Sequence, residues 1–194
     1  MPDVLDGAVV AGEDGLLRCP WVGAAPEYIA YHDDEWGKPV HDERGLYERM
    51  MLEAFQSGLS WITILRKREG IRDAFANFVP EDVAAFTDAD VARLLLDARI
   101  IRNRQKINAA ITNAKATIAL RGQGGLDALI WSYAVTDSPA PESIHHVPGS
   151  TPESTALAKA LKKAGFVFVG PTTAYAMMQA IGVVNDHLAH CHAR

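Results

Sequence analysis

Apolar positions recur every three or four residues along most of this chain, a spacing that is typical of amphipathic helices. The clearest run covers residues 103–120, with an apolar stripe at Ile107, Ala110, Ile111, Ala114 and Ile118. Only residues 166–170, FVFVG, have the β-branched and aromatic composition of a short strand. The pattern therefore predicts an all-α protein, with further helices over residues 43–56, 59–69, 82–86, 88–96, 154–164 and 171–182.

Local sequence supports several of these boundaries. Asp82 and Asp88 stand in the first turns of two predicted helices, where acids are favoured. Pro152 and Gly165 bracket another as a start and a stop. Residues 136–152 are rich in Pro, Ser and His and form the predicted long loop. Because there is no repeat and no long linker, we expect one domain, or two lobes that share helices.

Composition places the chain among ordinary globular proteins. It has 194 residues, of which 48% are hydrophobic and 22% charged. No apolar run approaches a membrane span, and the first residues lack the basic region of a signal peptide. We therefore expect a cytoplasmic location and no membrane partner. Cys19 and Cys191 could pair, but a reducing cytosol favours thiolates, and thiolates beside histidines favour a metal ion.

The net charge of −5 argues against a nucleic-acid partner, yet the charge is unevenly distributed. Residues 93–121 contain seven basic side chains and one acid, and Arg66, Lys67 and Arg68 form a second basic group. An acidic protein with one basic face can bind a phosphate backbone. Solvated helix faces explain the same charges equally well.

The helices predicted over residues 88–96 and 103–120 are joined by a short turn. Arg102, Arg104 and Lys106 stand at the start of the second helix, where backbone amides and basic side chains can bind a DNA phosphate. This arrangement suits a helix-hairpin-helix, although Arg99 occupies the place of the usual turn glycine. A plain αα-hairpin is the alternative.

Aromatic residues gather near the N-terminus and around one acid. Trp21, Tyr28, Tyr31 and Trp36 lie within 16 residues, and Trp61 follows later. Such residues form a core or a wall for a flat ring system. Glu53 stands between apolar neighbours, and a buried carboxylate indicates either function or a structural ion pair.

Six motifs resemble those of the DNA-3-methyladenine glycosylase I family in order and spacing. They are RCPWV, YIAYHDDEWG, LEAFQSGLSWITILRKRE, ARIIRNRQKINAAITNA, LAKALKKAGFVFVG and GVVNDH followed by a cysteine. The likeness runs from Leu17 to Cys191. It implies one all-helical helix-hairpin-helix glycosylase domain over residues 17–194, with the hairpin near residues 88–121. Residues 1–16 lie outside the likeness and are expected to be a flexible extension.

The resemblance implies one structural zinc ion that joins the chain ends through Cys19, His32, His187 and Cys191. Two cysteines and two histidines complete a tetrahedral zinc site and leave no position for water. His187 and Cys191 are four residues apart, as on one face of a helix. His190 and His192 flank Cys191 and could compete for the last position.

The resemblance also implies a base pocket of Glu53, Tyr31, Trp61 and Trp21, with Tyr28 nearby, and assigns catalysis to Glu53, Tyr31 and Trp61. Leu59, beside Gln56, would fill the gap left by a flipped nucleotide. The implied reaction is hydrolysis of the N-glycosidic bond of 3-methyladenine in alkylated double-stranded DNA. Water is the nucleophile, so the free base is released without strand cleavage, and we expect a monomer.

Two other classes of protein remain compatible with the sequence. A zinc-stapled helical DNA-binding module would keep the basic hairpin but would not need Glu53 or the aromatic wall. A zinc-dependent hydrolase would need an open coordination position at the metal.

Overall fold

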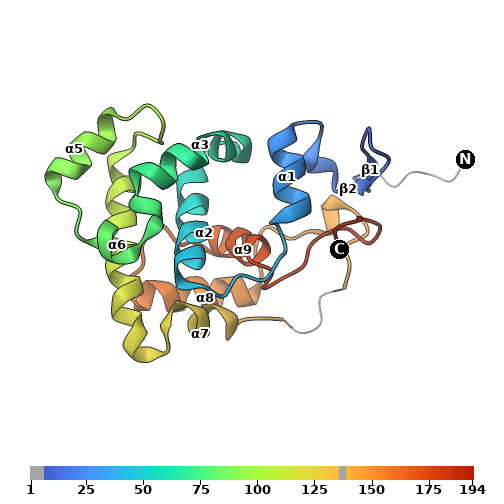
Figure 1. Ribbon diagram of the computed structural model, residues 1–194. Coiled ribbons are helices and arrows are strands. Elements are labelled where there is room, and N and C mark those ends of the chain that lie inside the picture. Colours follow the sequence, from blue (N-terminus) through green and yellow to red (C-terminus); the bar gives the residue numbers. More distant parts are fainter. Residues whose placement is uncertain (1–6, 136–138) are drawn as a thin grey trace, which may run out of the picture.

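The computed structural model describes residues 7–135 and 139–194, and helices make up most of this part of the chain (Figure 1). Two short antiparallel strands precede them and pair Val10 with Arg18 and Ala11 with Leu17. The strands and helices are β1 Val10–Ala11, β2 Leu17–Arg18, α1 Pro26–Asp34, α2 Glu43–Gln56, α3 Trp61–Ala74, α4 Pro80–Ala84, α5 Asp88–Leu96, α6 Arg104–Leu120, α7 Gly125–Trp131, α8 Pro152–Lys163 and α9 Pro171–Ala180. Four 3₁₀ turns complete the list: η1 Pro20–Val22, η2 Ala76–Phe78, η3 Arg121–Gln123 and η4 Ile144–His146.

The helices expected from the apolar periodicity are present, and those over residues 43–56 and 88–96 have the predicted ends. The pattern missed α1 and α7. The strand expected at residues 166–170 is wrong: the backbone there is irregular, and Phe168 has a φ of +58°. Residues 139–151 contain only η4, as a loop should, α8 begins at Pro152, and residues 136–138 lie outside the described part.

Helix α2 lies at the centre of the fold, and most of its residues from Leu46 to Phe55 are buried, including Glu48 and Glu53. It contacts α3, α6, α7 and α9, and residues 50–55 are all buried. A second, smaller apolar cluster joins Tyr31, Trp36 and Leu188 with the two cysteines. Trp61, at the start of α3, packs against both clusters. The boundary between the two clusters therefore passes through Trp61.

Helices α5 and α6 form the predicted hairpin, at the opposite end of the molecule from the C-terminus (Figure 1). The turn does not need a glycine of its own, since residues 97–103 all have negative φ. The small residue lies instead on α3: a Cβ on Gly70 would come within 2.6 Å of the Arg99 Cβ. The ammonium of Lys67 donates to the Ala98 carbonyl at 2.7 Å and fixes the turn to α3.

Residues 7–16, which belong to the expected flexible extension, contain β1 and contact the rest of the chain, while residues 1–6 lie outside the described part. Strand β1 pairs with β2, and the Gly7 carbonyl accepts a hydrogen bond from Ile144 N. Arg18 is buried and forms ion pairs with Asp14 and Asp33. These contacts hold the extension against β2 and η4, and Arg18 links it to α1 through Asp33. Within residues 7–135 and 139–194, no helix combines the length and the apolar character needed to cross a bilayer.

Candidate functional site

A cavity of about 470 Å³ lies where the two apolar clusters meet. Its walls come from η1, α1, the end of α2, the start of α3, the loop after η4 and one side of α9. All five residues predicted for one pocket line it: Trp21, Tyr28, Tyr31, Glu53 and Trp61. They are separated by up to 40 positions in the sequence, so the fold brings them together.

The aromatic rings form a rigid wall. Tyr31 and Trp61 have ring centroids 5.2 Å apart, and Trp21 meets Tyr28 edge-on at 5.7 Å. The Tyr28 hydroxyl accepts a hydrogen bond from Ile62 N at 3.1 Å, which satisfies a free amide at the start of α3. The buried indole N–H of Trp61 has no partner among the described residues and is available to a ligand.

Glu53 supplies the acid of the cavity. Its side chain is 6% exposed, and no residue in the described part hydrogen-bonds to its carboxyl group. Desolvation raises the pKa of Glu53 to about 8, and the positive charge of Arg49, one turn earlier on α2, only partly opposes this. The carboxyl is therefore mostly protonated at neutral pH and would ionise readily beside a cationic ligand.

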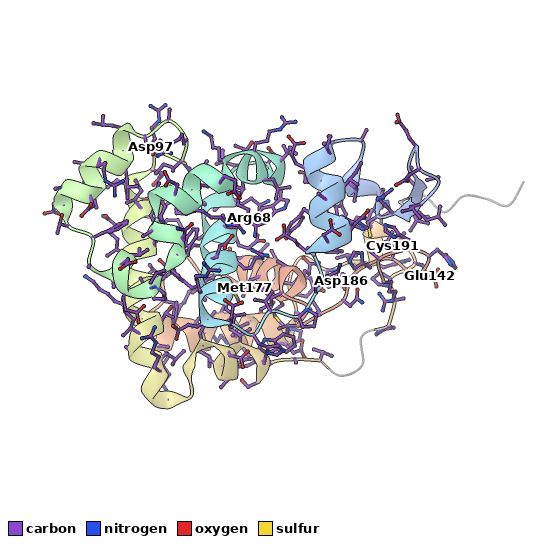
Figure 2. The ribbon with its side chains drawn as sticks, viewed as in Figure 1. Arg68, Asp97, Glu142, Met177, Asp186 and Cys191 are labelled. Atoms are coloured by element: carbon purple, nitrogen blue, oxygen red, sulfur yellow. The ribbon has the colours of Figure 1, made fainter. Side chains whose placement is uncertain are left out.

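The basic group at residues 66–68 is largely committed to ion pairs. Arg68, which is labelled in Figure 2, is buried and pairs with Glu48 at 2.9 Å and with Glu35 at 2.8 Å. Arg66 pairs with Glu27, and Lys67 binds the Ala98 carbonyl. This part of the charge pattern joins α1, α2 and α3 and is not a free basic face.

Sequence reasoning did not assign the rest of the cavity wall. Trp36 belongs to a motif that was recognised, but its place in the pocket was not. Gln179 reaches the cavity from α9, and its amide donates to Asp186 at 2.8 Å. Ile144, Val147 and Pro148 come from the predicted loop, where nothing in the sequence marks them as wall residues.

Gln56, the last residue of α2, lines the cavity, and Leu59 lies beside the cavity on the turn between α2 and α3. Leu59 is 40% exposed, Gly58 has a φ of +80°, and Leu59 N donates to the Gln56 carbonyl. A second hollow is lined by both residues and shares Glu53 with the main cavity. The side chain predicted to enter the duplex is thus exposed, on a tight turn next to the pocket.

Lys106 requires a correction. It was expected on the DNA-facing surface, but its side chain is 7% exposed, and burial lowers its pKa. Its ammonium donates to the carbonyls of Phe55 at 2.8 Å and Ser57 at 2.6 Å, where α2 ends. With its ammonium held by these two carbonyls below the surface, Lys106 does not offer a free cation to a phosphate.

Arg102 and Arg104 differ from their basic neighbours. Arg99 pairs with Asp73 and Asp97, and Arg121 pairs with two glutamates. Arg102 and Arg104 are exposed, and neither has an ion pair within the described residues. Asn103 between them caps α6 through bonds from Gln105 N and Lys106 N.

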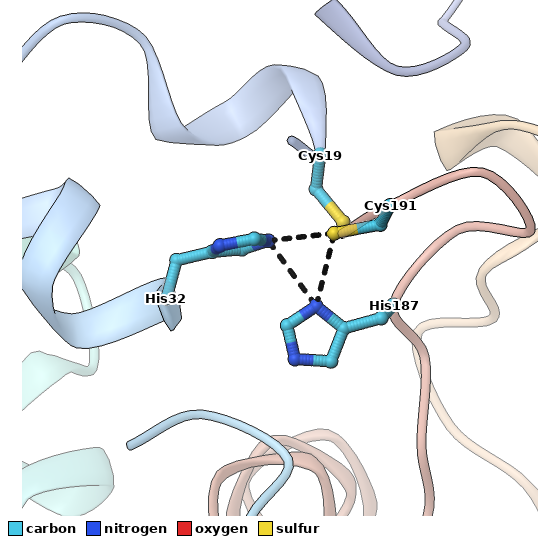
Figure 3. A group of neighbouring side chains, drawn as sticks. All are labelled: Cys19, His32, His187 and Cys191. Atoms are coloured by element: carbon cyan, nitrogen blue, oxygen red, sulfur yellow. Dashed lines mark hydrogen bonds between the residues drawn. The ribbon is translucent and has the colours of Figure 1, made fainter. Parts of the chain in front are cut away.

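Cys19, His32, His187 and Cys191 form a buried group whose ligand atoms all lie within 4.8 Å of one another (Figure 3). His32 Nε2 lies 3.2 Å from His187 Nδ1, and the Cys191 sulfur lies 3.3 and 3.4 Å from these nitrogens. Such separations match the edges of a tetrahedron around one ion. The group could hold a metal ion.

The outer contacts of the two histidines support this fit. His32 Nδ1 lies 2.7 Å from an Asp33 carboxylate oxygen and His187 Nε2 lies 2.9 Å from the Trp36 carbonyl. Both partners only accept hydrogen bonds, so these nitrogens carry the hydrogens. The lone pairs of the other two ring nitrogens therefore face each other. Burial also lowers the pKa of His187 to about 4, which keeps its ring neutral.

The C-terminal histidines can now be separated. His192 binds Asp33 at 3.0 Å, while His190 is exposed and lies outside the four-residue group. The helical face expected to present His187 and Cys191 is wrong, because residues 187–191 form a turn in which Cys191 N donates to the Leu188 carbonyl.

Comparison with known proteins agrees with this arrangement. The family model described as methyladenine glycosylase matches residues 21–194. The DNA-3-methyladenine glycosylase of Haemophilus influenzae is 47% identical over 180 residues, which cover 90% of this chain and 96% of the relative. A crystal structure of 3-methyladenine DNA glycosylase I superposes with a TM-score of 0.88 at 49% identity, covering 91% of this chain and 99% of the other. The crystal structure of a variant 3-methyladenine DNA glycosylase I in complex with 3-methyladenine has a TM-score of 0.86 at 32% identity. The match covers 91% of this chain and 96% of the other.

The helical fold, the acid-bearing aromatic pocket and these relatives define a DNA glycosylase, a hydrolase of N-glycosyl bonds. Within that class, the chain belongs to the methyladenine glycosylase family.

Proposed function

We propose that this protein removes 3-methyladenine from alkylated double-stranded DNA by hydrolysing its N-glycosidic bond, as a step of base-excision repair. The observation that carries the proposal is Glu53, a buried carboxyl group with no hydrogen-bond partner among the described residues, inside a cavity walled by Trp21, Tyr31 and Trp61. N3-methylation gives adenine a positive charge. Electron-rich rings and an ionisable carboxyl are the groups that recognise a flat cation.

The protein needs to transfer little proton to the departing base, because a cationic purine is already a good leaving group. Glu53 accepts hydrogen bonds from the adenine edge, and the base charge favours its ionised form. The rings of Tyr31 and Trp61 stabilise the bound base, and each cation–π contact contributes about 0.5–2 kcal/mol. Water completes the hydrolysis, so the abasic strand remains intact and the enzyme is monofunctional.

A base can enter this cavity only after it leaves the double helix, at a cost of a few kcal/mol. The exposed turn with Gln56 and Leu59 adjoins the pocket, which suits Leu59 to fill the vacated space. The α5–α6 hairpin serves as the helix-hairpin-helix, and Arg102 and Arg104 contact phosphates at its end.

Zn²⁺ is the ion that best fits the buried group of two cysteines and two histidines. These four residues would fill a tetrahedral site, so the metal would supply structural stability, and hydrolysis of the glycosidic bond would take place in the pocket. Trp21 and Tyr31 lie close in sequence to Cys19 and His32, so the same site holds part of the pocket wall.

The decisive experiment is incubation of methylated duplex DNA with the purified protein, followed by chromatography of the released bases. We expect free 3-methyladenine and DNA strands that break only after alkali treatment. Release should be abolished in Trp61→Ala and reduced in Glu53→Gln. Trp61→Phe is the matched control, because it keeps an aromatic face and should retain part of the release.

Wild-type protein that binds duplex DNA but releases no base would overturn the proposal and indicate a DNA-binding module. Release that stops immediately on chelation, in protein that is still folded, would indicate a metal-dependent hydrolase.

A further inference from the structure

Phe168 is an exposed aromatic residue in an unusual backbone conformation. Its side chain is 39% exposed and its φ is +58°, a region that side chains with a Cβ rarely occupy. The neighbouring Val167 is also 39% exposed. An apolar tip held in this conformation requires a surrounding structure that keeps it there.

Asn113 supplies that restraint. It is fully buried on α6, and its side-chain oxygen accepts from Val167 N at 2.8 Å while its amide nitrogen donates to the Val167 carbonyl at 3.0 Å. These two hydrogen bonds satisfy the backbone groups of Val167, which strand pairing would have satisfied if residues 166–170 formed a strand. They fix the backbone immediately before Phe168.

Helix α6 holds the Leu59 turn in the same way. Lys106 and Asn113 are seven residues apart, two turns of helix, and therefore lie on one face. Each is buried and binds backbone groups of a different loop, Lys106 at residues 55–57 and Asn113 at residue 167. One helix face thus supports two exposed apolar tips, Leu59 and Phe168.

The surface between the two tips is continuous with the pocket. The hollow beside Phe168 shares Ser57 and Thr173 with the hollow beside Leu59, and that hollow shares Glu53 and Gln56 with the main cavity. Lys162 adds a positive charge next to Phe168. A duplex that delivers a base to the cavity must cover the Leu59 turn, and this groove leads from there to Phe168.

We propose that Phe168 is a second DNA-binding residue, which packs against the duplex beside the extruded nucleotide while Leu59 fills the gap. This inference rests on the proposed function. The occupant is duplex DNA, because the groove opens from the base cavity itself and carries a lysine. An aromatic ring contacts any base or sugar through its apolar face, so the contact does not depend on sequence.

The test compares Phe168→Ala, Phe168→Gly and Phe168→Trp with the wild type on a duplex that carries an abasic-site analogue. We expect the alanine and glycine variants to bind about tenfold more weakly, equivalent to about 1.4 kcal/mol. The tryptophan variant should bind within about twofold of the wild type, because an indole presents the same apolar face. Binding of free 3-methyladenine should be unchanged in all three, since Phe168 does not line the base cavity.

Glycine separates a binding role from a structural one, because it tolerates positive φ and should leave the unfolding midpoint unchanged or higher. Val10→Ala is the control: Val10 is exposed, apolar and located on β1, outside the groove. Duplex affinity of Phe168→Gly within twofold of the wild type would overturn this inference, provided the wild type releases base. A wild type that releases no base would remove the proposed function, and this inference with it.

Discussion

The role of a residue in this protein depends more on the groups that surround its polar atoms than on its residue type. Glu53 and Glu48 stand on the same helix and are about equally buried. Glu48 is surrounded by Arg68, Arg72 and Arg49, which hold its pKa below the usual value against the opposing effect of burial. Glu53 has no hydrogen-bond partner among the described residues, and its pKa rises. One glutamate is therefore part of an ion-pair network, and the other is available to a ligand.

This difference predicts that Glu53 lowers the stability of the protein at neutral pH. The pKa of Glu53 is about 8 in the folded protein and 4.5 in its ordinary state, so the folded protein binds this proton more tightly. Its contribution to stability is complete below about pH 4.5 and is lost as the pH rises toward 8. The free energy of unfolding of Glu53→Gln should therefore be higher than that of the wild type by on the order of 3 kcal/mol at pH 7 and by little at pH 4.5. The same variant should release less base.

Urea unfolding of both proteins across pH 4.5 to 8 measures this difference. Equal stability at every pH would mean that Glu53 is not a desolvated acid in the folded protein. The mutant Glu48→Gln provides the comparison, and it should be less stable than the wild type at neutral pH because it leaves buried arginines without their partner.

Helix α6 connects the regions that the proposed function requires. Its first turn contains Arg104 on the surface and Lys106 beneath it, and its middle contains Asn113. Arg104 and Lys106 are two residues apart and point to different sides of the helix, so their roles should separate by mutation.

Lys106→Met and Arg104→Met form a matched pair for this comparison. Lys106→Met keeps the apolar stem but leaves the carbonyls of Phe55 and Ser57 without a donor, so we expect a loss of stability of about 1–3 kcal/mol. Arg104→Met should leave the unfolding midpoint unchanged. It should reduce the slope of log affinity against log salt concentration by about 1, as expected for the loss of one phosphate contact. Denaturant unfolding and DNA binding titrated with salt measure the two effects. The assignment would be wrong if Lys106→Met changed the salt slope without changing stability.

The sequence predicted α6 well and its partners poorly, for a physical reason. Helical periodicity is local, so the stripe from Ile107 to Ile118 predicted the element and part of its buried side; Ile107, Ala110 and Ala114 are buried, while Ile111 and Ile118 are only partly so. Whether Lys106 faces solvent or the end of α2 depends on a contact across 49 positions, which no local pattern contains. The pocket residues followed from family motifs, while Ile144 and Val147 did not, because a wall formed by a loop has no characteristic spacing.

The two ends of the described chain meet beside the pocket. Cys19 directly follows strand β2 near one end of the chain, and Cys191 lies in the C-terminal segment that begins after α9, where Asp186 and Cys191 are labelled in Figure 2. The two cysteines belong to the same buried group. Asp33 forms an ion pair with Arg18 and hydrogen bonds with His32 and His192, so the hairpin of the extension and the last residues share one polar network. The ring of Trp21 lies 5.3 Å from that of His32, which connects this network to the cavity wall.

Removal of the proposed zinc ion should therefore weaken base binding in the pocket as well as destabilise the fold. We expect the wild type to contain about one zinc ion per chain and Cys191→Ala to contain far less, with a melting temperature lower by on the order of 10 °C. Binding of free 3-methyladenine should weaken in Cys191→Ala even though Cys191 does not line the cavity, because Trp21 and Tyr31 lose their anchor. His190→Ala is the matched control, since His190 is exposed and outside the cluster, and it should keep its zinc. Metal analysis, thermal melting and calorimetry of base binding measure these effects, and zinc retained by Cys191→Ala with unchanged melting would refute the ligand assignment.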